Sequence, residues 1–396
     1  MRENTPEDTV RRSTRVGEIP LLFVLIGILA FARGANAQIR GMFVPTGDMT
    51  MARAGHSATL LLDGTVLIAG GDGPAALGVP VPAGRTAELY DPAMGAFAPT
   101  GNMIEPRYSH TATLLPNGKV LIVGGSKDTT AELYDPSTRE FSLTGPMGAQ
   151  QQWVMATLLG NGKVLVAGNV DAELYDPATG SFVPAAPYAA LSRGSTATLL
   201  ADGRVLLVGD DPAQLYDSVS NSFSITGSLA SAGLPGVDQQ TATLLNNGEV
   251  LITGGSNDEV APAGRVAAAE LYDPATGAFT ATSAMHSPRD AHAAVLLADV
   301  KVLIVGGDTV TVIGDFGYYA GSLASAEVYD PLSGTFWPAG SMNAARTAPQ
   351  ATLLKNGDVL ITGGFSYCGI GCFHGSLASA ELYHPPLSRR RVVHQR

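Results

Sequence analysis

Apolar and polar positions follow one pattern that returns seven times along the chain, most clearly from Thr111 to Phe141. Each unit starts with a short segment and a turn such as Asn117-Gly118, followed by an apolar run such as Val120 to Val123 that ends in glycine. After a variable stretch comes Ala-Glu-Leu-Tyr-Asp-Pro, and in six units a phenylalanine lies seven residues beyond the tyrosine. Short apolar segments bounded by turn residues predict four strands per unit, A to D.

The punctuation between these segments predicts how the strands pair. Asn-Gly and Asp-Gly favour a type I′ turn with positive φ at both central residues, so strands A and B form a tight hairpin. A wholly apolar strand B implies that both faces of the sheet are covered. One antiparallel meander of this size leaves both faces bare, whereas radial stacking of seven covers them. The predicted fold is an all-β, seven-bladed β-propeller over residues 38–387.

The last unit lacks the phenylalanine after Tyr383, and the missing strand is found at the other end of the chain. Phe43 opens the segment FVPTGDM, which matches FSLTGPM from Phe141. The N-terminal strand is therefore predicted to complete the blade that the C-terminal strands begin, which closes the ring.

Paired glycines, a tyrosine and an aromatic residue at a fixed distance resemble the Kelch repeat, in the secreted bacterial variety related to the galactose oxidase propeller. The resemblance covers about residues 42 to 385 and implies the fold; propellers host both enzymes and binding proteins. In that oxidase, two tyrosines, two histidines and a cysteine cross-linked to one tyrosine form the copper site. Tyr108 and His110 stand where the enzyme has a metal-binding pair, but Ser109 separates them and the rest of the set is not reproduced. We therefore expect no cofactor, no metal and no catalytic residue.

Composition and the two ends of the chain bear on location and partners. The chain has 45% hydrophobic residues, a net charge of −11 and no basic stripe, which argues against nucleic acid as a partner. Arginines up to Arg15 precede an apolar run from Leu21 to Ala32 and a small-x-small site at Ala35 to Ala37, which predicts a signal peptide over residues 1–37. Nearby acidic residues leave an uncleaved anchor as the alternative. The expected product is a secreted or periplasmic monomer with no membrane span and a basic, disordered tail over residues 388–396.

Both cysteines lie in the glycine-rich segment SYCGIGCFHG. In an oxidising compartment Cys368 and Cys372 most simply form a disulfide with each other; free thiols, or a metal held together with His374, are the alternatives. The disulfide would hold the flanking Tyr367, Phe373 and His374 in place as ligand contacts.

The loops that lead from one blade to the next carry repeated polar residues. Arginine occupies the fourth place in four of these seven-residue loops and histidine the seventh place in three: Arg53, Arg107, Arg289, Arg346, His56, His110 and His292. One interpretation is a ring of ligand-binding side chains around the channel mouth, together with Tyr108; the other is that the arginines fix blade-to-blade contacts by binding backbone carbonyls. The third loop has lost both the arginine, where Gln151 stands, and the histidine. It carries Trp153, either as a stacking surface for a sugar or as a channel plug or filler between blades.

The stretches between strands B and C break the symmetry of the repeat. They are long at residues 72–86, 256–268, 308–325 and 365–379, which belong to the contiguous blades 1, 5, 6 and 7. Insertions on one arc of a scaffold usually carry function, although neutral drift is the alternative. The predicted function is an exported, non-catalytic Kelch propeller that binds a glycan or protein on this face. The alternative is a galactose-oxidase-like secreted oxidase or another carbohydrate-active enzyme.

Overall fold

The computed structural model describes residues 41–71, 82–151, 153–189, 191, 194–209, 212–229, 239–256, 264–312, 318–369 and 372–386. The predicted signal peptide and basic tail lie outside these residues. The described part contains seven four-stranded antiparallel sheets and two two-stranded ones, and the seven larger sheets confirm the predicted propeller. Numbered from the first complete blade, blades 1 to 3 have these strands: β2 (Ser57–Leu60), β3 (Val66–Ala69), β4 (Ala87–Asp91) and β5 (Ala96–Pro99); β6 (Thr111–Leu114), β7 (Val120–Val123), β8 (Ala131–Asp135) and β9 (Glu140–Leu143); β10 (Met155–Leu158), β11 (Val164–Ala167), β12 (Ala172–Asp176) and β13 (Ser181–Pro184).

Blades 4 to 7 repeat the same order from strand A to strand D. Their strands are β14 (Thr196–Leu199), β15 (Val205–Val208), β16 (Gln214–Asp217) and β17 (Ser222–Ile225); β18 (Thr241–Leu244), β19 (Val250–Thr253), β20 (Ala269–Asp273) and β21 (Ala278–Ala281); β22 (Ala293–Leu296), β23 (Val302–Val305), β26 (Ser325–Asp330) and β27 (Thr335–Ser341); β28 (Gln350–Leu353), β29 (Val359–Thr362), β32 (Ala380–His384) and β1 (Met42–Pro45).

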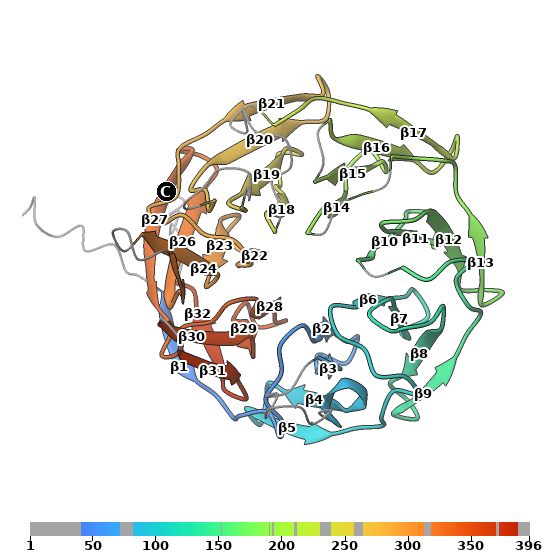
Figure 1. The fold of residues 1–396 in the computed structure, drawn as a ribbon, viewed down its shortest axis with the longest axis horizontal. Coiled ribbons are helices and arrows are strands. Elements are labelled where there is room, and N and C mark those ends of the chain that lie inside the picture. Colours follow the sequence, from blue (N-terminus) through green and yellow to red (C-terminus); the bar gives the residue numbers. More distant parts are fainter. Residues whose placement is uncertain are drawn as a thin grey trace, which may run out of the picture. The chain divides into compact units, whose positions relative to one another are not determined.

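The A strands of successive blades contact one another in a closed cycle that returns from β28 to β2, and the seven sheets surround a common centre (Figure 1). The predicted closure is confirmed: β1 pairs antiparallel with β32, so that Phe43 lies opposite Tyr383. In Figure 1 the blue N-terminal strand lies beside the red C-terminal one. The last blade therefore combines both ends of the described chain.

Each hydrophobic cluster fills the space between two neighbouring blades. The four residues of every B strand are buried, as expected for a sheet covered on both faces. The repeated tyrosine of strand C packs on the phenylalanine of strand D, with ring centroids 4.8 Å apart for Tyr90 and Phe97. The Tyr90 hydroxyl lies 2.8 Å from Thr46 Oγ1 of the preceding blade. The fixed tyrosine–phenylalanine spacing thus sets the C–D register, and in five blades the tyrosine hydroxyl also bonds to a threonine of the preceding blade.

The turns between strands A and B differ from the predicted type I′ geometry. In the turn at Asp63-Gly64 only the glycine has positive φ, at 97°, and its N–H donates to the Leu61 carbonyl. The asparagine or aspartate before the glycine does not adopt a positive φ, because a single residue with positive φ suffices to close this three-residue loop. In blade 6, where no glycine is present, Val300 takes this position with φ 70°.

Two B–C stretches of the predicted arc form additional hairpins. In blade 6, β24 (Asp308–Val312) pairs with β25 (Tyr318–Ser322), and in blade 7, β30 (Phe365–Gly369) pairs with β31 (Cys372–Ser376). β25 and β30 lie against each other, so the two hairpins are neighbours. In blade 1, the described end of the stretch is a short 3-10 helix η1 (Pro82–Arg85). The B–C and inter-blade connections together make up what we call the loop face, and the A–B and C–D turns form the opposite turn face.

Candidate functional site on the loop face

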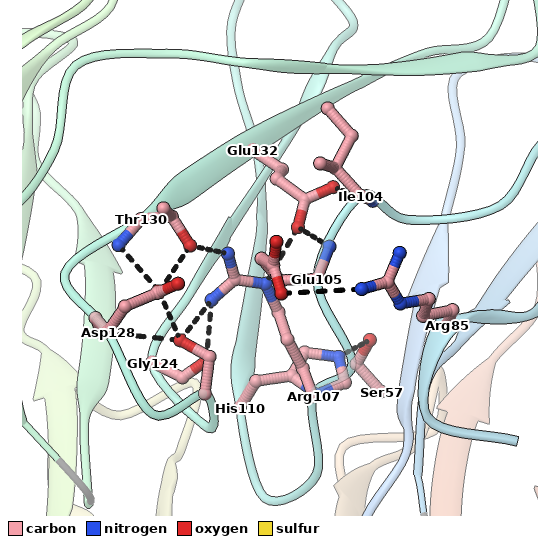
Figure 2. A network of polar contacts seen from close by, with 11 residues as sticks. Ser57, Arg85, Ile104, Glu105, Arg107, His110, Gly124, Asp128, Thr130 and Glu132 are labelled. Atoms are coloured by element: carbon pink, nitrogen blue, oxygen red, sulfur yellow. Dashed lines mark hydrogen bonds and ion pairs between the residues drawn. The ribbon is translucent and has the colours of Figure 1, made fainter. Parts of the chain in front are cut away.

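Arg107 shows what the repeated arginine does. Its guanidinium donates to the Gly124 carbonyl at 2.9 Å, to Thr130 Oγ1 at 2.8 Å and to Glu132 Oε1 at 3.0 Å, all in blade 2 (Figure 2). Its backbone N–H and carbonyl instead bond to Gly84 and Gly71 of blade 1. One residue therefore fastens two blades together.

The same arrangement recurs at the three other arginines. Arg53 binds the Gly70 and Thr86 carbonyls and Glu88, while Arg289 and Arg346 bind the matching groups of blades 6 and 7. All four side chains are fully buried beneath the loop face. Their guanidinium groups are engaged by the protein and do not face a ligand. The geometry thus favours the blade-fixing interpretation over the cationic ring.

The three histidines at the seventh loop place are buried as well. His110 Nε2 lies 2.9 Å from Ser57 Oγ, and His56 Nε2 lies 2.8 Å from Thr362 Oγ1, in each case across a blade boundary. His292 Nε2 makes the equivalent contact with Thr241 Oγ1 at 2.9 Å. Burial lowers the pKa of each ring to about 3, with a smaller contribution from the nearby arginine. At pH 7 the rings are neutral, so they add no positive charge to the channel mouth.

Blade 3 departs from this pattern. Gln151 replaces the arginine and donates to Asp171 Oδ1 at 2.6 Å, while the Tyr188 hydroxyl donates to the Gly168 and Asp171 carbonyls. These two carbonyls correspond to those that an arginine binds in blade 1. Glu173 receives backbone N–H bonds from the Gly148 region and no contact from a cation of the described residues, and burial raises its pKa. Blade 3 is therefore fastened by a tyrosine and a glutamine in place of an arginine.

Exposed aromatic side chains occur on the loop face of blades 2 and 3. Trp153 is 39% exposed and Tyr108 is 63% exposed. They flank the end of strand B in blade 2: the Tyr108 N–H donates to the Gly125 carbonyl, and Val154, next to Trp153, packs over Gly124. Val170, in the short B–C stretch of blade 3, is exposed too. Both aromatic residues were expected to be ligand contacts, and both are accessible to one.

The remaining predicted contacts belong to hairpin β30–β31. The Tyr367 N–H donates to Ser322 Oγ of the neighbouring hairpin at 3.0 Å. The backbones of Cys368, Cys372, Phe373 and His374 are described as strand, but their side chains lie outside the described part of the structure. The disulfide stays a prediction, which intact-mass analysis of alkylated, unreduced protein tests.

Sequence reasoning missed a buried carboxylate pair beside hairpin β24–β25. Asp290 follows Arg289 in the loop between blades 5 and 6, and Asp308 begins β24. Arg265 Nε lies 3.0 Å from Asp290 Oδ2 and 2.9 Å from Asp308 Oδ1. Burial first, and then the adjacent Asp308, raise the pKa of Asp290 to about 8. The available signal was an aspartate at a loop place where other blades have Ala54, Tyr108 or Thr347.

Comparisons with known proteins leave the family open but agree on the fold. No family model matches the chain, and no curated protein matches it. A solved structure of a fungal alcohol oxidase of the AA5 family, noted for catalytic diversity and in complex with copper, aligns with a TM-score of 0.70. The two chains share 18% identity, and the alignment covers 89% of this chain and 77% of the oxidase. This likeness establishes the propeller fold.

The described residues do not fit a copper site of the oxidase kind. Tyr108 is exposed and His110 is buried against Ser57, both at the loop face. The second Tyr-His pair is elsewhere: Tyr383 packs on Phe43, and His384 Nδ1 lies 2.7 Å from Asp358, beside a turn of the opposite face. In the described ranges, no three His, Cys, Asp or Glu side chains are grouped so that they could hold a metal. Those ranges likewise contain no helix long and apolar enough to cross a membrane.

Proposed function

We propose that this chain is an exported, non-catalytic propeller that binds a glycan or a protein on its loop face. The observation that carries the proposal is the exposure of Trp153 and Tyr108 beside the channel mouth. Indole and phenol rings offer flat apolar surfaces with a polar edge, which suit stacking on a sugar ring or packing in a protein interface. In the described part of this face, the repeated arginines are buried and engaged by the protein and the repeated histidines are neutral, which favours a ligand without strong negative charge.

The hairpins of blades 6 and 7 support the same face. β24–β25 and β30–β31 pack against each other beyond the B strands of their blades and widen the surface on one side of the ring. Rigid β-hairpins lose little conformational entropy when a ligand binds, so they are suitable for recognition. Blades 2 and 3, which have short B–C stretches, leave Trp153 open to solvent.

Ligand binding can be measured by tryptophan fluorescence, because the chain has two tryptophans, Trp153 and Trp337. Trp337, in the outer strand β27, is 47% exposed and serves as the matched control. A glycan array and a secretome protein panel supply the ligands. We expect Trp153→Ala and Tyr108→Ala to weaken binding at least tenfold, about 1.4 kcal/mol each, and Trp337→Ala to leave it unchanged. Equal losses in all three variants, or no ligand from either source, would contradict the proposal.

An oxidase is the second candidate function, favoured by the structural likeness to a copper-bound AA5 alcohol oxidase. Purified protein reconstituted with Cu²⁺ and assayed for hydrogen peroxide with a panel of alcohols separates the two. Stoichiometric copper together with turnover would replace the binding proposal. Turnover-free protein that binds a ligand through Trp153 supports it.

A further inference from the structure

Three chain segments meet at the base of hairpin β24–β25. Arg265 comes from the B–C stretch of blade 5, Asp290 from the loop between blades 5 and 6, and Asp308 from the first position of β24. The backbones of Asp290 and Asp308 form an isolated antiparallel bridge, with N–H···O distances of 3.2 and 3.0 Å. Arg265 spans both carboxylates from the neighbouring blade. The hairpin is thus tied to blade 5 through these side chains.

The surroundings of Asp290 do not favour its ionised form. It is 1% exposed, and apart from Arg265 its carboxyl group interacts only with the Ser256 hydroxyl and, through a shared hydrogen bond, with the Asp308 carboxyl among the described side chains. Arg265 Nε, 3.0 Å from Asp290 Oδ2, is shared with Asp308, to which Arg265 Nη2 also donates. A single guanidinium balances one carboxylate, so a second ionised carboxylate here would be a buried, uncompensated charge.

Among the residues that the structure describes, the other charged groups near Asp290 do not supply the missing balance. The Arg289 guanidinium is turned to Glu327 and the Gly306 carbonyl. His292 is neutral, and burial together with the charge of Asp308 raises the pKa of Tyr367, so its phenol is neutral at pH 7. Ser256, on the blade 5 side, gives Asp290 a hydrogen bond that only partly opposes the rise in its pKa. With that pKa at about 8, Asp290 keeps its proton at pH 7 and the three groups sum to zero charge.

We propose that Arg265, Asp290 and Asp308 form a proton-dependent clamp that fixes hairpin β24–β25 to blade 5. While Asp290 is protonated the cluster is neutral and the clamp is closed. Loss of that proton leaves two carboxylates against one arginine, and their repulsion loosens the base of the hairpin. This inference does not depend on a bound ligand or on the proposed function.

The base of hairpin β30–β31 shows the uncharged counterpart of this contact. Thr347 occupies the loop place of Asp290 and makes the same backbone bridge, to Phe365. Its hydroxyl lies 2.8 Å from Ser322 Oγ, so the contact at this base is uncharged. The anchoring contact of this hairpin does not titrate between pH 7 and 9.5.

Hydrogen exchange of the full chain at pH 7 and 9.5, converted to protection factors, tests the clamp. In the unmodified protein we expect protection in Asp308–Val312 and Tyr318–Ser322 to fall by about tenfold, because the loss is a factor of ten per pH unit below the Asp290 pKa of about 8 and levels off above it. Asp290→Asn, which keeps the shape without the charge, should show no such fall. A fall of the same size in Asp290→Asn would overturn the clamp.

A second variant and a direct titration guard against misfolding of Asp290→Asn. Asp308→Asn leaves one carboxylate for one arginine, so its hairpin should also be insensitive to pH in this range. Carboxyl ¹³C NMR of the unmodified protein should show one aspartate that titrates near pH 8 and is missing in Asp290→Asn. If all aspartates titrate below pH 5, the clamp does not exist.

Discussion

Val300 lies where every equivalent A–B turn has a glycine, and its replacement should make the protein more stable. The six glycines have φ between 83° and 97°, and Val300 has φ 70°. The left-handed conformation costs an L-residue about 1–2 kcal/mol, and a β-branched residue lies at the upper end of that range. Glycine lowers the free energy of unfolding by about 0.4–1 kcal/mol, because it gives the unfolded chain more conformational freedom. Val300→Gly should therefore stabilise the fold by about 1 kcal/mol.

Calorimetry at pH 7 provides the assay. With an unfolding entropy of about 2.1 cal/mol/K per residue, 1 kcal/mol raises the Tm of a unit of this size by about 1–2 °C. Gly248→Val is the reciprocal control, because no heavy atom lies within 4 Å of the position its Cβ would take. It should lower the Tm by a similar amount, and the double variant should return to the starting value. An unchanged or lower Tm for Val300→Gly would refute the argument from backbone strain.

Three further outcomes follow from the contacts between blades. Deleting residues 41–49 uncovers the edge of β32 and should lower the Tm by more than about 5 °C, whereas deleting residues 389–396 should leave it nearly unchanged in thermal melts. Arg107→Met leaves Glu132 buried without a cation and should cost about 3–5 kcal/mol in guanidinium unfolding; a loss below about 1 kcal/mol would show that backbone N–H groups suffice. The depressed pKa of His110 means that the unfolded chain binds a proton below about pH 6.5 while the folded one does not until about pH 3, so stability falls as pH drops through this window. His110→Gln should make that fall shallower by up to about 1.4 kcal/mol per pH unit, and an unchanged acid profile would contradict the neutral, buried ring.

The repeat predicted the fold because its signals are local and periodic. The tyrosine and phenylalanine seven residues apart are cross-strand neighbours, as Tyr134 and Phe141 show, and the segment at Phe43 supplied the missing partner of Tyr383. The type of turn was harder to predict from the sequence, because Asn-Gly is compatible with more than one type of turn. Which type forms depends on the register of the hairpin.

Site residues were harder to interpret because sequence position does not reveal burial. Arg107 and Tyr108 are adjacent in the chain, yet one side chain is fully buried and the other is 63% exposed. The pair of Asp290 and Asp308 depends on a contact between a loop and the first residue of a hairpin within a non-repeated stretch. Periodicity carries no information about such a contact. Only the departure of Asp290 from the uncharged residues at its loop place marked it as unusual.

The pairing of β1 with β32 has a consequence for the order in which the molecule assembles. These strands lie at opposite ends of the described chain, so blade 7 cannot be completed until nearly all of it has been synthesised. Until then both strands present unpaired edges, and joining them requires closure of the longest loop in the fold. Blades 1 to 5 are built from consecutive strands, and blade 6 is interrupted only by hairpin β24–β25, so these six blades can form earlier. We therefore expect ring closure to be the slow final step of folding, and the open ring to be the species most prone to aggregation.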